Sequence, residues 1–124
     1  MQDKLQIIFD MQQSLNDEIK QKRDLKGISK EEWMQKQTLA MLSEMAELID
    51  EVNFKWWKNP KPVDEEKVKY ELVDILHFFV SMCLIYDMDA KELFDKYINK
   101  NKENFDRQYG KSSKKGYDIN TIDK

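Results

Sequence analysis

The stretch Glu71-Leu-Val-Asp-Ile-Leu-His-Phe-Phe-Val-Ser-Met-Cys-Leu-Ile-Tyr86 is the most apolar run in an otherwise polar chain. Three ionisable residues, Glu71, Asp74 and His77, lie in its first half at intervals of three. On a helix this spacing places them along one side, drifting about 60° at each step. A carboxylate among apolar side chains either takes up a proton or pairs with a cation. The stretch therefore predicts a helix that presents acidic groups to a positively charged partner.

The composition around this stretch favours a single all-α domain. The chain has 124 residues, of which 36% are charged and 40% hydrophobic, and this is too apolar for a disordered protein. Because only three Gly and two Pro occur, few turns are available, and we expect long amphipathic helices instead of a sheet. A chain of this length buries only a small core, so dimerisation would help to stabilise it.

Charge and cysteine usage limit the possible partners. The net charge is −3 with both signs interleaved, whereas nucleic-acid binding requires a basic face. The one cysteine, Cys83, cannot form an intrachain disulfide, which favours a reducing compartment. The N-terminus does not resemble a signal peptide, and the apolar run Ile75–Tyr86 is too short to span a bilayer. We expect a cytoplasmic protein with neither nucleic-acid nor membrane partners.

Residues that favour helix ends predict four helices. Helix starts are expected after Asp3, Ser29 and Asp89, each followed three residues later by Gln or Glu, and at the acidic residues 64–66. The prolines of Asn59-Pro-Lys-Pro62 end the second helix, which is predicted to run from Lys30 to about Trp57. The first helix fades within residues 21–27, and the third ends near residue 87. Residues 1–107 are thus predicted to form a single helical catalytic domain, and residues 108–124 a flexible basic tail.

Two acidic pairs carry the clearest chemical signal. Glu44-x-x-Glu47 and Glu71-x-x-Asp74 each place two carboxylates one turn apart, on consecutive predicted helices. If these helices pack antiparallel, as the short connection indicates, the four groups face and repel one another. Hard divalent cations relieve such repulsion, and Mg²⁺ fits because substrate phosphates can complete its coordination. A single pair on a polar helix is usually just solvated, but the repetition favours a metal site.

Several polar residues have both a structural and a functional interpretation. Gln13 and Asn16 share a helical face with Phe9; they are either surface amides or the donors and acceptors that a nucleobase edge needs. His77 follows Asp74 by three residues and either packs in the core or orients a carboxylate or substrate.

The fourth predicted helix and the tryptophan pair leave similar alternatives. Lys100, Asn104 and Arg107 share one helical face; they either complement the helix C-terminus or grip a phosphate, with Arg supplying two aligned hydrogen bonds. Trp56-Trp57 forms a core contact, a dimer contact or a stacking surface for a ligand.

Four segments of the chain together form a recognisable pattern. They are Met11-Gln-Gln-Ser-Leu-Asn16, Glu44-Met-Ala-Glu-Leu-Ile-Asp-Glu51 running into Phe54-Lys-Trp-Trp-Lys58, Glu71-Leu-Val-Asp-Ile-Leu-His77, and Lys100-Asn-Lys-Glu-Asn104 with Arg107-Gln108. The pattern resembles the dimeric dUTPase family of the all-α NTP pyrophosphohydrolase superfamily, with MazG-like proteins as wider relatives. The first and fourth segments and the tryptophan segment are the more specific ones.

The resemblance implies a fold, an activity and a set of site residues. The fold is an antiparallel four-to-five-helix bundle, assembled as a homodimer or a dimer of dimers, whose active sites draw on both subunits. The implied reaction is hydrolysis of dUTP to dUMP and pyrophosphate with Mg²⁺, for which Mn²⁺ can substitute. The implied metal ligands are Glu44, Glu47, Glu71 and Asp74, with Glu44 as the catalytic base. The implied substrate contacts are Gln13, Asn16, Trp56 and His77 toward the nucleoside, Lys58, and Lys100, Asn104 and Arg107 toward the phosphates.

Three alternatives to dUTP hydrolysis stay open. The same reaction on another nucleotide, such as dCTP or a damaged NTP, is the nearest one. A di-iron carboxylate bundle would recruit two Glu-x-x-His motifs, which a chain with one histidine can supply only as a symmetric dimer. A non-enzymatic helical interaction module is the third.

Overall fold

A computed structural model describes residues 2–121, and these residues form helices and no strand. The elements are α1 (Lys4–Lys22), α2 (Lys30–Glu51), α3 (Glu65–Ile85), α4 (Ala90–Gln108) and the 3₁₀ helix η1 (Ile119–Thr121). The predicted all-α class is confirmed. Contacts divide the chain into two compact units after Asp89, with α1 to α3 in the first and α4 and η1 in the second. None of the helices described combines the length and apolar character needed to cross a membrane.

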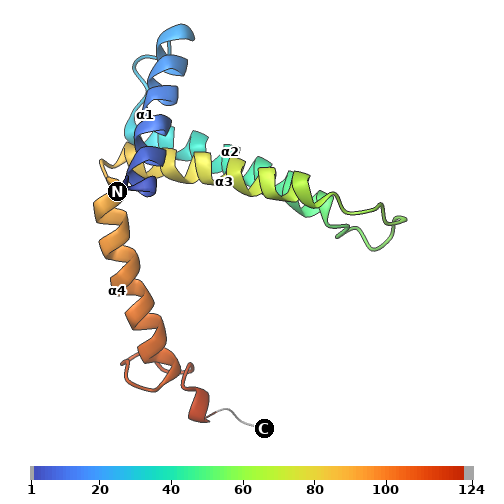
Figure 1. The fold of residues 1–124 in the computed structure, drawn as a ribbon, viewed down its shortest axis with the longest axis vertical. Helices are drawn as coiled ribbons and strands as arrows, with labels where there is room; N and C mark the ends of the chain where they lie inside the picture. Colours follow the sequence, from blue (N-terminus) through green and yellow to red (C-terminus); the bar gives the residue numbers. More distant parts are fainter. Residues whose placement is uncertain (1, 122–124) are drawn as a thin grey trace. The chain divides into compact units, whose positions relative to one another are not determined.

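The first unit is built on an antiparallel pair of helices. The chain runs out along α2 and returns beside it along α3 (Figure 1), as predicted, and α1 packs against α3. Phe9 of α1 and Val80 of α3 are the largest fully buried side chains among the described residues, and Cys83 is also buried. The apolar second half of the stretch 71–86 thus supplies much of this small core, and the acidic first half lies farther along the pair.

Three of the four predicted helix starts are confirmed by capping hydrogen bonds, and the fourth, after Asp89, is confirmed by the start of α4 at Ala90. The Asp3 carboxylate accepts from the backbone N–H of Gln6 at 3.1 Å, and the Ser29 hydroxyl accepts from that of Glu32 at 3.1 Å. Asp64 accepts from two backbone N–H groups in the first turn of α3. These residues satisfy N–H groups that have no partner within the helix.

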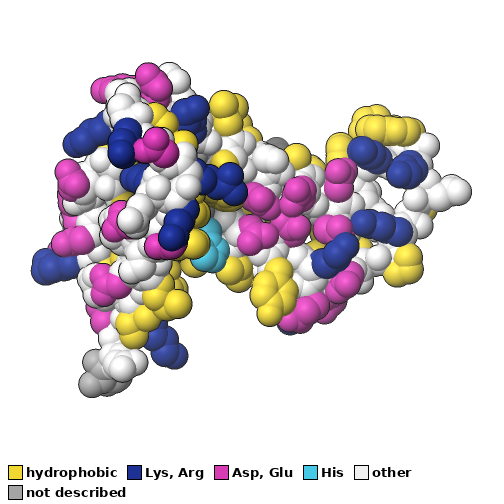
Figure 2. All heavy atoms as spheres, turned by 90° about the horizontal axis from the view of Figure 1, so that it is seen from above, with side chains coloured by type: hydrophobic (Ala, Val, Ile, Leu, Met, Phe, Trp, Pro, Cys, Tyr) yellow, Lys and Arg dark blue, Asp and Glu magenta, His cyan; other side chains and the backbone are white. Residues whose placement is uncertain are grey.

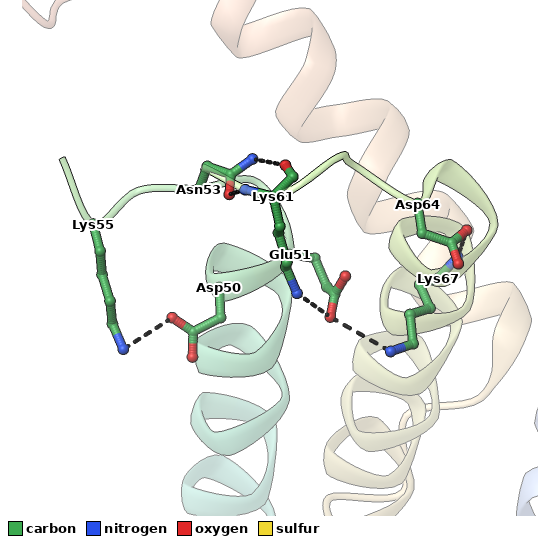
Figure 3. A network of polar contacts seen from close by, with 7 residues as sticks. All are labelled: Asp50, Glu51, Asn53, Lys55, Lys61, Asp64 and Lys67. Atoms are coloured by element: carbon green, nitrogen blue, oxygen red, sulfur yellow. Dashed lines mark hydrogen bonds and ion pairs between the residues drawn. The ribbon is translucent and has the colours of Figure 1, made fainter. Parts of the chain in front are cut away.

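The predicted end of α2 near Trp57 is wrong, because the helix ends at Glu51. Asn53 adopts a left-handed backbone with φ of 59°, which Asn tolerates better than most residues. Its carboxamide donates to the carbonyl oxygen of Lys61 at 2.8 Å and accepts from the N–H of Lys61 at 3.0 Å (Figure 3). This double hydrogen bond closes residues 54–60 into a loop, and the tryptophan pair lies in that loop.

Glu51 connects the same loop to α3. Its side chain is only 14% exposed and lies 3.3 Å from the ammonium nitrogen of Lys61 and 3.9 Å from that of Lys67 (Figure 3). An ion pair with one well-covered partner is screened less by solvent than a fully exposed one. The far end of the α2–α3 pair is therefore held by polar contacts.

In the second unit, the residues after α4 fold back on that helix. Glu103 accepts hydrogen bonds from Arg107 Nε at 3.1 Å and from the Ser112 hydroxyl at 2.6 Å, and these bonds lower the pKa of Glu103. The Arg107 guanidinium lies 5.6 Å from the ring centre of Tyr117. The described part of the predicted tail thus contacts α4, and residues 122–124 lie outside the described residues. The domain limit at residue 107 and the flexibility of the tail stay predictions.

Candidate active site

Three of the four predicted metal ligands come together between α2 and α3. Glu44, Glu47 and Glu71 each offer one carboxylate oxygen, and these oxygens all lie within 4.8 Å of one another. Glu44 Oε2 and Glu71 Oε2 are buried and have no hydrogen-bond partner among the described residues. Figure 2 shows acidic side chains gathered over this helix pair, beside the histidine. Carboxylate oxygens of this kind are the ligands that Mg²⁺ prefers in proteins, so the residues fit a divalent cation.

The cluster perturbs the ionisation of Glu44. Removal from water raises the pKa of Glu44 to about 7, and the neighbouring carboxyl groups of Glu71, Glu47 and Asp74 act in the same direction. Near neutral pH the cation-free cluster therefore retains part of a proton on Glu44. A cation would replace that proton, because metal ligation requires the ionised carboxylate.

Asp74, the fourth predicted ligand, lies at the edge of the cluster. Its side chain is not among those whose oxygens meet within 4.8 Å, but its charge acts on Glu44. Asp74 and Glu44 also line a cavity of about 480 Å³ that adjoins the cluster. Asp74 thus lies between the acidic cluster and the cavity.

All three helices of the first unit line the cavity, which is open to solvent on one side. Its polar and aromatic lining comes from α1, α2 and α3, namely Gln12, Asn16, Lys20, Trp33, Gln37, His77, Phe78 and Ser81. The Lys20 ammonium lies 5.0 Å from the ring centre of Trp33 on the next helix. A pocket with an apolar body and a few convergent polar groups suits a small organic ligand such as a nucleoside.

Four of these residues form a hydrogen-bonded ring. The carboxamide oxygen of Gln12 pairs with His77 Nδ1, and Gln12 Nε2 donates to Asn16 Oδ1 at 2.9 Å. Asn16 Nδ2 donates to the Ser81 hydroxyl at 3.1 Å, and that hydroxyl donates to the backbone carbonyl of His77 at 2.8 Å. Gln12 and Ser81 are buried, so the ring is a fixed part of the cavity wall.

The two predicted amides have different positions. Asn16 lies in the cavity wall, whereas Gln13 is exposed, donates to Asp17 at 2.9 Å and borders a smaller pocket of about 50 Å³. Gln12, not Gln13, lies beside Asn16 in the cavity wall, because residues four apart on a helix share a face. The four-residue spacing of Gln12 and Asn16 was the sequence feature that could have identified Gln12 as a cavity residue.

Trp33, Gln37 and Ser81 are cavity residues that the motifs did not indicate. Trp33 and Gln37 are four residues apart, and Gln37 and Glu44 seven apart, so all three share one face of α2. Extending this helical spacing from Glu44 toward the N-terminus of α2 could have identified Trp33 and Gln37 from the sequence.

Trp56 and Lys58 lie in the loop beyond α2. Trp56 is 85% exposed, and Lys58 lines a separate pocket of about 300 Å³ with other loop residues. Neither residue lines the cavity within its own chain.

Lys100, Asn104 and Arg107 lie on α4, in the second unit. The Arg107 Nη1 lies 3.5 Å from Asn104 Oδ1, so two of the three side chains meet. Their predicted contact with phosphates stays a prediction.

The site therefore consists of a carboxylate cluster that fits a divalent cation, between antiparallel helices, and an adjoining cavity that suits a small organic ligand. A family model described as dUTPase matches residues 4–92, and the chain belongs to this family. The match includes α1, α2 and α3, which build both the cluster and the cavity.

Two phage enzymes are among the similar proteins. The dCTP pyrophosphatase of Enterobacteria phage T4 is 49% identical over 47 residues, which are 38% of this chain and 28% of the phage protein. The dCTP pyrophosphatase of Enterobacteria phage LZ5 is 34% identical over 74 residues, which are 60% of this chain and 43% of that protein. This chain thus spans less than half the length of either relative. No solved structure shows a significant match.

Proposed function

We propose that the protein is a Mg²⁺-dependent nucleoside triphosphate pyrophosphohydrolase that converts dUTP to dUMP and pyrophosphate. The observation that carries this proposal is the cluster of Glu44, Glu47 and Glu71 at the edge of a cavity, in which two buried carboxylate oxygens have no hydrogen-bond partner among residues 2–121. Membership of the dUTPase family supports it.

The acidic cluster would hold the cation, and the cavity would hold the nucleoside. Glu44, Glu47, Glu71 and Asp74 are the proposed ligands, and bound Mg²⁺ (or Mn²⁺ in its place) would neutralise phosphate oxygens and activate a water molecule. Since Glu44 and Asp74 border the cavity, a nucleoside inside it directs its phosphates toward the cluster.

Glu44 is the residue to which we assign the proton of the attacking water. A general base must lie within hydrogen-bond reach of the proton that it takes, and Glu44 lies both in the acidic cluster and on the cavity wall. Arg107 and Lys100 are proposed to stabilise charge that develops on the phosphates.

A second candidate substrate is dCTP, because two similar phage proteins are named dCTP pyrophosphatase. The amides in the cavity wall do not decide between the two bases by composition, since each carboxamide offers both donors and an acceptor.

We also propose that the active form is a homodimer. Apolar side chains of α1 and α3 line an open groove of about 520 Å³, and many are well exposed, among them Ile8, Met11, Leu15, Val73 and Leu76. Large exposed apolar patches are rare on monomers. A second copy of the chain could cover this surface and also bring its own Trp56 and Lys58 toward the cavity.

The test is a panel of NTPs and dNTPs with Mg²⁺ or with EDTA, with the products separated by chromatography. We expect dUTP hydrolysis well above that of dTTP and UTP, no turnover in EDTA, and a loss on the order of 10²-fold or more in Glu71→Gln. Glu18→Gln, an exposed carboxylate of α1, is the matched control and should keep full activity. Equal rates on purines and pyrimidines would contradict the uracil assignment. No hydrolysis of any nucleotide, or iron in the purified protein, would contradict the proposal as a whole.

A further inference from the structure

The hydrogen-bonded ring in the cavity wall has a direction, and the direction is set by a backbone carbonyl. The carbonyl oxygen of His77 can only accept, so the Ser81 hydroxyl, 2.8 Å away, donates to it. That hydroxyl has one hydrogen, and it must therefore accept from the Asn16 side chain at 3.1 Å. Its separation of 3.5 Å from Asn16 Oδ1 is too long to compete.

The orientations of both carboxamides follow from this hydrogen bond. Because the NH₂ group of Asn16 faces Ser81, its Oδ1 accepts from Gln12 Nε2 at 2.9 Å. The NH₂ group of Gln12 is then turned toward Asn16, and its oxygen faces His77 Nδ1. A carboxamide oxygen can only accept, so Nδ1 carries the hydrogen of this bond.

We infer that Gln12 is a positioning residue that holds His77 as the Nδ1–H tautomer, so that Nε2 is presented to the cavity ligand as a hydrogen-bond acceptor. The tautomer of a histidine is set by the partner of its other ring nitrogen, and Gln12 is buried and fixed by the ring. The His77 side chain is exposed and lines the cavity, and none of the hydrogen bonds among residues 2–121 involves its Nε2.

The Nδ1–H tautomer of His77 limits which ligand groups the cavity accepts. A neutral Nε2 acceptor binds an N–H or O–H group and disfavours a bare acceptor at the same point. This step rests on the proposed function: for a nucleotide ligand, the matching group is a sugar hydroxyl or an N–H of the base.

Two-bond ¹H–¹⁵N correlation NMR of the nucleotide-free protein, at a pH where the ring is neutral, tests the tautomer directly. His77 is the chain's one histidine, so a single imidazole is observed. We expect a protonated Nδ1 and an unprotonated Nε2 in the wild type, and a mixture of tautomers in Gln12→Met. Gln13→Met, the exposed neighbour outside the ring, is the matched control and should leave the spectrum of the wild type unchanged. Circular dichroism reports the helix content of both variants.

Three NMR results would contradict the assigned tautomer of His77. A proton on Nε2 in the wild type, or an unchanged Nδ1–H form in folded Gln12→Met, would overturn the inference. If Gln12→Met does not fold, Gln12→Glu takes its place, since a carboxylate still accepts at Nδ1 and should keep the hydrogen there; loss of the Nδ1 proton in that variant would also overturn it.

Kinetics give a second readout. In an active enzyme, Gln12→Met should raise KM about tenfold through the loss of one ligand hydrogen bond, with a smaller change in kcat. An absence of turnover in the wild type would count against the proposed function alone, because the NMR result needs no substrate.

Discussion

The raised pKa of Glu44 makes the stability of the folded protein depend on pH. Burial and the carboxyls of Glu71, Glu47 and Asp74 raise its pKa from 4.5 to about 7. A proton bound more tightly in the folded state stabilises it below the unfolded pKa, and this contribution is lost as the pH rises through the folded pKa.

The stability of the cation-free protein should therefore fall between about pH 4.5 and 7 because of Glu44. In Glu44→Gln, which cannot ionise, we expect this fall to be smaller. Thermal melting in EDTA across this range measures it, with Glu18→Gln as the control. A wild-type profile that Glu44→Gln leaves unchanged would contradict the assignment.

Asp74→Asn separates a cation site from a structural ion-pair network. Without metal, removing one of several like charges should leave the protein equally stable or more stable. Breaking a buried ion pair would instead cost roughly 3–5 kcal/mol. Mg²⁺ that binds only the folded wild type stabilises it by about 2.7 kcal/mol at a hundredfold excess over Kd, and Asp74→Asn should lose most of this gain.

Melting curves of wild type and Asp74→Asn, in EDTA and in millimolar Mg²⁺, provide the measurement. A strongly destabilised Asp74→Asn in EDTA, together with a wild type indifferent to Mg²⁺ with and without nucleotide, would refute the metal-site assignment.

At the scale of the elements, the ends of the helices differ in how far the sequence predicts them. The starts at Asp3, Ser29 and Asp64 depend on side chains that bond residues two or three positions away, and local sequence was sufficient. The end of α2 depends on Asn53 bonding Lys61 eight residues later, which no local pattern indicates.

Asn53 should accordingly stabilise the α2–α3 pair. Asn53→Ala removes two hydrogen bonds and places Ala in a left-handed backbone, and we expect a loss of about 2–3 kcal/mol. Asn53→Gly removes the same bonds but accepts the backbone, so it should cost less than Asn53→Ala. Urea denaturation of both variants measures the difference; equal stability of Asn53→Ala and wild type would contradict this role.

The site shows the same division between local and distant information. The acidic pairs of Glu44 and Glu71 repeat at helical spacing, and an antiparallel pairing of the two helices was enough to predict that they meet. Gln12 lies in the cavity wall and Gln13 is exposed because of the rotation of α1 against α3, which is set by packing and not by the amides themselves; the predicted contact of Gln13 with a nucleoside stays a prediction.

For the whole molecule, the extent of exposed apolar surface predicts self-association. Residues such as Met11, Leu72 and Val73 are from 45% to 68% exposed, and few side chains of the described residues are fully buried. Trp56 and Lys58 do not line the cavity of their own chain, so their predicted contacts with the substrate stay predictions that require a second copy of the chain.

We expect a solution mass of twice 15.0 kDa by light scattering and a melting temperature that rises with protein concentration. Leu76→Lys, in the apolar groove, should shift the mass toward the monomer, whereas Glu18→Lys should not. A monomer at all concentrations would contradict the homodimer.

³¹P NMR of dUTP and of dCTP incubated with the purified protein and Mg²⁺ tests the proposed reaction at the acidic cluster. We expect the triphosphate signals of at least one of them to be replaced by those of a nucleoside monophosphate and pyrophosphate. We expect no change in EDTA or with Glu44→Gln, and full conversion with Glu18→Gln. Orthophosphate and a nucleoside diphosphate as first products, or conversion that persists in Glu44→Gln, would contradict a pyrophosphohydrolase acting at this cluster.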